Sequence, residues 1–407
     1  MRKLKIVVTA ILLLFITRYS LFITNCIAQW YPLPVFPSYR QTLDVKFFDE
    51  NTGIIITQNI DSNRGILRTT NGGQNWIQIK HCYNYACQKI DSTIFYSIST
   101  INGYSFLYRT FNKGVTWDSV SSYSGIGYNR LSFINKDTGW VSGWIDGVPY
   151  IWRTTNGGIN LTIQAGSNVG GNEIFFYNKK VNGEYVGWVN NSSALWKTTN
   201  SGNNWFQVSC PGTDLYQITF INEYTGWASI GNMYKTTDGG LNWIQQSIAP
   251  GIQNIGRSIT KFSIINKDTI YGAGGYKYLP NSHITAMIWK TTNGGAVWGY
   301  QEIDSSYNVG VVYCIDFINY STGWAFQGNG IHTTNGGGQI TGIHKEETVL
   351  NDYKLFQNYP NPFNSISKIK YQILKTSDVQ IKVFDIQGRE ISILVNRKQT
   401  PGNYECN

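Results

Sequence analysis

The chain has 407 residues and a formal net charge of +9, and only 14% of its residues are charged, against about 25% in typical globular proteins. Segment 1–28 holds four basic residues and no acid, which leaves +5 on the other residues. This modest charge, with no basic run interleaved with aromatic residues, argues against nucleic-acid binding.

The first 28 residues have the pattern of a secretory signal. Arg2, Lys3 and Lys5 precede an apolar run over residues 6–17, which is too short to cross a bilayer, since a spanning helix needs about 20 residues. Cys26 and Ala28 supply small residues at positions −3 and −1 of a cut before residue 29. We therefore predict a cleaved signal peptide over residues 1–28. An uncleaved anchor and a lipoprotein cut before Cys26 are the alternatives.

A five-residue pattern, Thr-x-(Asn/Asp)-x-Gly, recurs seven times after the signal, and we call each copy a box. Successive final glycines are 41, 44, 44, 38, 55 and 42 residues apart. A period of about 40–50 residues in β-type sequence predicts four-stranded propeller blades. We expect the Asn or Asp to accept backbone N–H groups and the last Gly to adopt a positive φ. These residues are Asn71, Gly73, Asn112, Gly114, Asn156, Gly158, Asn200, Gly202, Asp238, Gly240, Asn293, Gly295, Asn335 and Gly337.

A second turn, ending in Thr-Gly or Thr-Gly-Trp, precedes several boxes, as at 49–53, 135–140 and 319–324. Residues 216–248 show the order in one blade: strand, this first turn, two strands, the box and a fourth strand. An aromatic residue follows most boxes by three positions and should pack between blades. It is Trp76, Trp117, Trp205, Trp243 or Trp298, with Leu161 and Ile340 in blades three and seven.

These patterns predict an all-β fold: a seven-bladed β-propeller of four-stranded blades over residues 29–342. Blade seven ends near residue 340 without a clear fourth strand led by tryptophan. Trp30 begins such a strand without a blade. We therefore predict that Trp30 completes the last blade and joins the two ends of the ring.

The box resembles the Asp-box, or BNR repeat, and the paired turns are most similar to the propellers of the photosystem II assembly and stability factor family. Six of the seven boxes carry Asn where the Asp-box has Asp. The resemblance implies fold rather than activity. Asp-boxes also occur in sialidases and in xyloglucan-cleaving hydrolases, where they lie at the periphery, away from the active face.

Residues 343–351 read as a polar linker, and residues 352–407 predict a small β-sandwich. The Asn-Tyr-Pro-Asn-Pro-Phe-Asn run at 358–364 and the Val-Phe-Asp-x-x-Gly-Arg-Glu hairpin at 383–390 resemble the type A C-terminal sorting domain of the type IX secretion system. The resemblance implies export across an outer membrane by the type IX secretion machinery. It also implies removal by a sortase-like peptidase, with release or surface attachment. Because that family continues to one more strand, we expect the last strands to be incomplete.

Cys82 and Cys87 could form a small loop disulfide in an oxidising compartment. No metal site is predicted, because zinc needs four ligands and only His81 lies near these cysteines. No cofactor is predicted either.

The order of strands puts both repeated turns on one face of the propeller, the box face, and the longer, more varied connections on the opposite face, the loop face. Function usually resides on such loops. These connections are rich in Tyr, Ser, Gly and Asn, which suits the binding of sugars or peptides. The candidate binding residues are Tyr83, Tyr85, Tyr128, Trp144, Tyr150, Tyr276, Tyr278 and Tyr307.

Catalysis has weaker support in the sequence. A glycosidase needs two carboxylates across a cleft, and nothing pairs the loop-face acids Asp61, Asp146, Asp214 and Asp304. Arg68, Arg109 and Arg153 could represent a sialidase triad, but each directly precedes a box, where other blades have Lys or His. We therefore predict that this repeated position is a solvated strand position.

The predicted function is that of a secreted or cell-surface, non-catalytic propeller that binds a protein or polysaccharide through its loop face. The alternative is an extracellular glycoside hydrolase of the Asp-box propeller type. Membrane contact is expected only through the signal peptide or surface attachment.

Overall fold

The computed structural model describes residues 30–34, 41–58, 65–166, 169, 171–191, 194–212, 215–280, 283–327, 329–338, 340–341, 354–355, 367–373, 375–384 and 389–406. The chain divides into two compact units, Met1–Ile343 and His344–Asn407. The predicted signal peptide and linker lie outside the described residues. Within those residues, no helix is long and apolar enough to cross a membrane.

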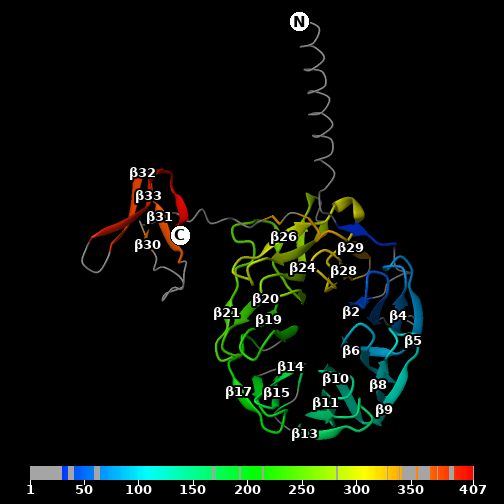
Figure 1. Ribbon diagram of the computed structural model, residues 1–407. Coiled ribbons are helices and arrows are strands. Elements are labelled where there is room, and N and C mark those ends of the chain that lie inside the picture. The colour runs from blue at the N-terminus through cyan, green and yellow to red at the C-terminus, as the bar shows by residue number, and fades with distance from the viewer. Residues whose placement is uncertain are drawn as a thin grey trace, which may run out of the picture. The chain divides into compact units, whose positions relative to one another are not determined.

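The first unit is a ring of seven blades (Figure 1), each an antiparallel sheet whose strands follow one another from the centre outward. Blades one and two contain β2 (Gln41–Phe47), β3 (Gly53–Gln58), β4 (Gly65–Thr69) and β5 (Ile77–His81), then β6 (Tyr83–Lys89), β7 (Phe95–Ile101), β8 (Tyr104–Thr110) and β9 (Asp118–Ser124). Blades three and four contain β10 (Ile126–Phe133), β11 (Gly139–Ile145), β12 (Val148–Thr154) and β13 (Thr162–Gly166), then β14 (Glu173–Val181), β15 (Glu184–Asn190), β16 (Leu195–Thr198) and β17 (Phe206–Val208).

The last three blades include one irregular sheet. Blade five contains β18 (Gln217–Phe220), β19 (Gly226–Ile230), β20 (Asn232–Thr236) and β21 (Ile244–Gln245). In blade six, β22 (Ile255–Gly256) and β23 (Lys261–Ile264) both pair with β24 (Ile270–Tyr278), which is followed by β25 (Ile284–Thr291) and β26 (Gly299–Glu302). A short 3-10 helix, η2 (Ser305–Tyr307), leads to blade seven, with β27 (Cys314–Phe317), β28 (Gly323–Phe326), β29 (Gly330–Thr333) and β1 (Tyr31–Pro32).

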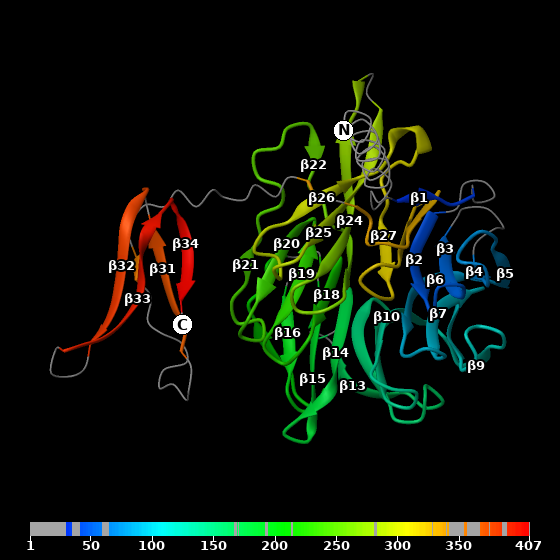
Figure 2. The same ribbon diagram turned by 45° about the horizontal axis from the view of Figure 1, so that its top comes forward.

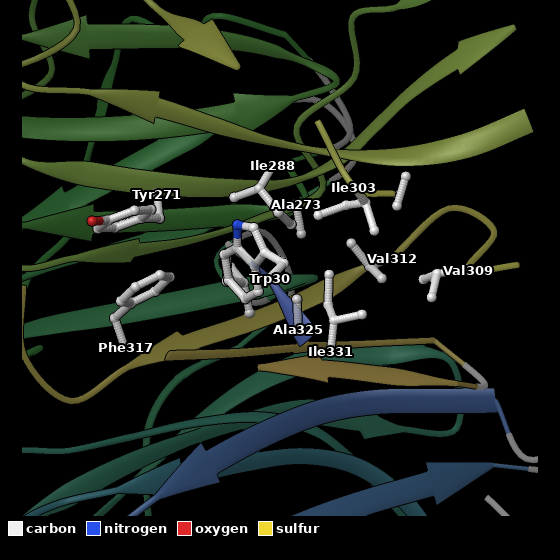
Figure 3. Close-up of a cluster of buried hydrophobic side chains, with 12 residues drawn as sticks. Trp30, Tyr271, Ala273, Ile288, Ile303, Val309, Val312, Phe317, Ala325 and Ile331 are labelled. Carbon is white, nitrogen blue, oxygen red and sulfur yellow. The ribbon is translucent and has the colours of Figure 1, made fainter. Parts of the chain in front are cut away.

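The N-terminal strand closes the ring. β1 pairs antiparallel with β29, with Tyr31 opposite His332. Trp30 is fully buried, and its Nε1 donates a hydrogen bond to Gln301 Oε1 at 3.1 Å. Figure 3 shows its ring between side chains of blades six and seven, with Phe317 edge-on at 5.7 Å. The prediction that Trp30 completes the last blade is confirmed.

The box turns are built as their residue types predict. In all seven boxes, the Thr hydroxyl accepts the N–H of the final Gly at 2.8–3.0 Å. In six of them, the Asn or Asp Oδ1 accepts the N–H four residues later at 2.9–3.1 Å. The final glycines have φ between 77° and 95°, a region that other residues rarely adopt. The two repeated turns also touch, since Gly157 N–H donates to Asp137 O at 2.7 Å.

A second aromatic series, which follows the first turn, also joins the blades. Each of these rings stacks on a Phe of the next blade's innermost strand, with ring centroids 3.6–3.8 Å apart. The pairs are Tyr96 with Phe133, Trp140 with Phe176, Trp188 with Phe220, Tyr271 with Phe317 and Trp324 with Phe47. Three of the predicted box tryptophans, Trp76, Trp205 and Trp243, pack edge-on against these Phe rings, with centroids 5.9–6.0 Å apart. Trp117 packs edge-on against Phe95 instead.

The second unit has two small sheets. One contains β30 (Lys354–Leu355), β31 (Ile369–Ile373) and β34 (Gly402–Cys406), and the other contains β32 (Ser377–Phe384) and β33 (Glu390–Gln399). Tyr371 and Ile373 of the first sheet pack with Val395 of the second in one apolar cluster. This is the small two-sheet domain that the alternating sequence predicts.

Candidate functional site

The innermost strands of all seven blades surround a central cavity of about 270 Å³. Three basic and two acidic side chains lie among its lining residues. The lining consists of Leu43, Asp44, Lys46, Ile56, Ala86, Cys87, Gln88, Arg130, Leu131, Ser132, Glu173, Ile174, Phe175, Gln217, Ile218, Thr219, Lys261, Phe262 and Ile315. This cavity is not predicted from the sequence.

Lys46 lies between two carboxylates. Its Nζ is 3.0 Å from Asp44 Oδ1 and 3.7 Å from Asp316 Oδ1. Burial alone would lower the pKa of Lys46, but the two carboxylates outweigh it and raise that pKa above its ordinary range. Asp316 Oδ2 also accepts the N–H of Phe47 at 2.8 Å. This carboxylate therefore links the last blade to the first.

Arg130 and Glu173 form a second ion pair, with Arg130 Nε 3.0 Å from Glu173 Oε2. Arg130 also donates to the backbone and side-chain oxygens of Asn129, both at 3.0 Å. The strand register shifts between Tyr128 and Arg130, and such a bulge redirects the side chains beside it. Asn129 of the same strand and Glu173 of the next blade thus fix the position of the Arg130 guanidinium.

Polar side chains of the inner strands bind the backbone of the following blade. Gln88 and Gln217 each bond both the N–H and the C=O of one residue, whereas Ser132 and Ser263 each accept one N–H. The pairs are Gln88 with Phe133 (2.6 and 2.9 Å), Gln217 with Phe262 (2.8 and 3.0 Å), Ser132 with Phe176 (2.8 Å) and Ser263 with Phe317 (3.1 Å). Much of the polar lining is therefore committed to holding the blades together.

Two thiols, the partly buried Cys87 and the buried Cys314, lie beside these charges. Burial is the main cause that raises the pKa of both, and the Asp44 carboxylate adds to it. They stay protonated at neutral pH and so are poor nucleophiles. Among the residues described, no group of three His, Cys, Asp or Glu side chains is arranged to hold a metal ion.

The predicted disulfide between Cys82 and Cys87 is wrong, because the two sulfurs are not bonded to each other. The sequence analysis treated residues 83–86 as a small loop, but they belong to β6. An extended strand rises about 3.3 Å per residue, so five residues separate the two Cα atoms by about 16 Å. A disulfide needs less than about 7 Å.

The predicted binding residues lie at the loop-face ends of several blades and form no single cluster. Tyr128 is only 1% exposed, and its ring packs against Trp152 at 5.6 Å, so it offers no surface to a ligand. Tyr83 is exposed, and the side chain of Tyr85 lies outside the described residues. Trp144, Tyr150 and Tyr307 are half-buried.

Tyr128 and Tyr150 share a contact with Trp152 in the core of blade three, whereas Tyr276 and Tyr278 form a pair that reaches the surface. Their ring centroids are 5.2 Å apart with the rings nearly perpendicular, their hydroxyls are 3.3 Å apart, and Tyr278 is 51% exposed. Figure 2 shows the β24–β25 hairpin that carries them projecting from the ring. The hydrogen bond with Tyr278 raises the pKa of Tyr276, and Tyr313 contributes to the same shift. Tyr313, which precedes β27 and was not among the predicted residues, therefore lies within electrostatic reach of Tyr276.

Two of the four predicted carboxylates, Asp61 and Asp214, lie outside the described residues. Asp146 lies in the tight turn between β11 and β12, with a positive φ of 49°. Asp304 accepts the N–H of Ser306 at the start of η2, and this bond lowers its pKa. The two lie at the tips of connections in different blades and are not a catalytic pair.

The prediction that the basic residue before each box is solvated is wrong. Five of these side chains donate to a backbone carbonyl in the next blade's box at 2.7–3.1 Å. The donors are Arg68, Arg109, Lys197, Lys235 and Lys290. Lys197 also lies over the Trp188 ring, with Nζ 5.2 Å from its centroid. These cations fasten blade to blade, which a single-blade reading of the sequence could not reveal.

Comparison with known proteins gives a family for the C-terminal unit and a fold for the ring. Residues 357–405 match the family described as "Secretion system C-terminal sorting domain". No curated protein matches the chain. The chain is similar to the solved structure of YCF48 bound to D1 peptide, with a TM-score of 0.54 and 15% identity over 76% of this chain and 99% of that one.

It is also similar to a GH74 enzyme from Niastella koreensis, with a TM-score of 0.57 and 12% identity over 82% of this chain but only 57% of the enzyme. For YCF48 from Cyanidioschyzon merolae, the TM-score is 0.50 and the identity 14%, over 76% of this chain and 99% of that one. At these identities the likeness concerns the fold alone. The chain therefore consists of a seven-bladed β-propeller followed by a secretion system C-terminal sorting domain, which directs it through the type IX secretion system to the cell surface or the medium.

Proposed function

We propose that the exported propeller is a non-catalytic binding module that holds a protein or polysaccharide partner on its loop face. The observation that carries this proposal is the Tyr276–Tyr278 pair, in which Tyr278 is 51% exposed. Tyrosines supply a large, rigid contact area and a polar hydroxyl at a small entropic cost, which suits sugar rings and peptides alike.

The charge next to this pair in the sequence leaves the tyrosine face neutral, because successive side chains of a strand point to opposite faces and Lys277 therefore points away from both rings. Lys277 lies between the two tyrosines in sequence, and its Nζ is 2.8 Å from Glu302 Oε1. The ammonium and the carboxylate are thus balanced against each other. A partner rich in hydroxyl or amide groups would bind here without leaving a desolvated charge unpaired.

The carboxylates of the central cavity support binding rather than hydrolysis. A glycosidase needs one carboxylic acid with a raised pKa and a second carboxylate across the scissile bond. Asp44 and Asp316 are paired with Lys46, and Glu173 is paired with Arg130. Each of these carboxylates is thus occupied by a cation of the ring itself. The alternative, a glycoside hydrolase, would therefore depend on loop carboxylates such as Asp146.

The test uses an array of neutral and acidic polysaccharides and peptides probed with the exported chain. Replacing Tyr276 and Tyr278 together by alanine should weaken binding at least about tenfold, since hot-spot aromatics contribute about 2 kcal/mol or more. Tyr224→Ala, in a first turn on the box face and 58% exposed, is the matched control. Binding that survives the double substitution would contradict the proposal, and sugar release from xyloglucan that Asp146→Asn abolishes would favour the hydrolase.

We further infer that a sortase-like peptidase removes the sorting domain after export, with release or surface attachment of the propeller. Mass spectrometry of the exported chain checks this. A product that retains residues 357–405 would contradict it.

A further inference from the structure

Blade three carries a polar pocket on the box face, away from the loop-face tyrosines. The cavity measures about 300 Å³, at the lower end of the range of about 300–1,000 Å³ for small-molecule sites. Its lining holds one guanidinium, three amides and two hydroxyls, and no carboxylate. The lining residues are Arg153, Thr155, Asn156, Asn160, Thr162 and Gln164.

Arg153 departs from the pattern of five of the other six blades. The equivalent Lys197 and Lys235 each donate to a carbonyl in the next box, whereas the Arg153 side chain makes no hydrogen bond or ion pair with any described residue. Its Nε is buried without a partner, and the guanidinium lies 5.5 Å from the centroid of the Trp140 ring. The carbonyl that it would be expected to bond, that of Ser201, accepts Trp140 Nε1 at 3.2 Å.

Two neighbouring amides add a hydrogen-bond donor, from Asn156, and an acceptor, from Gln164, to the Arg153 guanidinium. Asn156 Oδ1 accepts both Thr154 Oγ1 and the N–H of Asn160 at 3.0 Å, so its Nδ2 is left to donate toward the pocket. Gln164 Oε1 is buried and has no hydrogen-bond partner among the residues described. A buried polar atom left unsatisfied costs about 1–3 kcal/mol, so a ligand that bonds it gains affinity.

We propose that this pocket binds a carboxylate that has a hydroxyl or amide donor next to it. A guanidinium presents a planar fork of N–H donors that matches a carboxylate. The Asn156 amide adds a further donor, and Gln164 Oε1 accepts from the ligand's own hydroxyl or N–H. An acidic sugar residue and the free C-terminus of a peptide share this chemistry. Blade three is also a blade in which Leu161 replaces the box tryptophan.

The experiment is calorimetric titration of the exported chain with four probes: glucuronate, its methyl ester, acetyl-glycyl-glycine and the C-terminal amide of that peptide. At least one of the two carboxylates, glucuronate or acetyl-glycyl-glycine, should bind, whereas the methyl ester and the peptide amide should not. The tighter carboxylate identifies the source of the ligand. Arg153→Met should weaken binding at least about tenfold, since hydrogen bonds to charged groups are the strong ones. Arg153→Lys keeps the positive charge but loses the planar fork of N–H donors, so its affinity for the carboxylate should lie between those of the unaltered chain and of Arg153→Met.

Lys235→Met is the matched control at the same position of blade five. It should leave carboxylate binding unchanged but lower the urea midpoint of unfolding, because it removes the bond to Gly294 O. Arg153→Met should leave the midpoint unchanged, since Arg153 holds no such bond. The proposal is overturned if the ester binds as well as glucuronate, or if Arg153→Met retains carboxylate affinity. It is also overturned if Arg153→Met destabilises the fold as Lys235→Met does and neither carboxylate binds.

Discussion

Replacing Trp30 by alanine should open the ring at the point where the chain closes it. The indole is fully buried, contacts Phe317 edge-on at 5.7 Å and donates to Gln301 Oε1 at 3.1 Å. Truncating a buried aromatic costs about 3–5 kcal/mol, and Gln301 Oε1 would lose a buried donor worth about 1–3 kcal/mol. Because these two effects overlap, we expect a loss of about 4–6 kcal/mol.

The assay is urea unfolding of the exported chain followed by far-ultraviolet circular dichroism. Trp30→Phe keeps an aromatic ring and removes only the N–H, so it should lose about 1–3 kcal/mol. Tyr31→Ala changes a side chain that is 41% exposed on the same strand and should fall within about 0.5 kcal/mol of the unaltered chain. A Trp30→Ala chain that unfolds within about 1 kcal/mol of the unaltered one would refute the view that β1 is needed to close the ring.

Two further predictions concern packing and pH. Gly139→Ala should lower the free energy of unfolding by about 1–3 kcal/mol. The added Cβ would lie 2.4 Å from Cγ of Phe133, whose ring is held against Tyr96. Gly310→Ala, where the added Cβ meets no atom within 4 Å, is the control, and equal urea midpoints for the two variants would contradict the prediction. Burial lowers the pKa of His332, which lies opposite β1. On acidification the unfolded chain therefore binds a proton at this residue more readily than the folded chain does. The stability that the folded chain has above the unfolded pKa of about 6.5 is lost as the pH falls below it. His332→Asn should flatten the dependence of the urea midpoint on pH, and an unchanged slope would count against the assignment.

The repeated turns could be predicted in detail because their chemistry is local. Thr110, Asn112 and Gly114 lie within five residues, and the side chains bond backbone groups no more than four residues away. Hydroxyl, amide and glycine each have one role in such a turn. The closure by Trp30 was also predictable, because one blade lacked a fourth strand and one strand lacked a blade.

The charged cavity could not be predicted, because its contacts join residues that only the closed ring brings together. Asp316 and Phe47 are 269 positions apart in the chain, and nothing near either residue indicates the other. The tyrosines illustrate a second limit. Tyr128 and Tyr278 stand in similar polar stretches, yet Tyr128 packs in the core and Tyr278 is exposed, because burial depends on the neighbouring blade.

Ligand chemistry in this ring should be sought where a blade departs from the others. Each blade must contact two neighbours in the same geometry, so residues that serve the ring recur at fixed positions, as the Lys197 and Lys235 bonds do. A residue that serves a ligand carries no such constraint. Blade six departs through the long β24–β25 hairpin with Tyr276 and Tyr278, and blade three departs through Arg153, a cation without the bond that its counterparts make. The two proposed sites thus coincide with exceptions to the repeat, one on each face of the propeller.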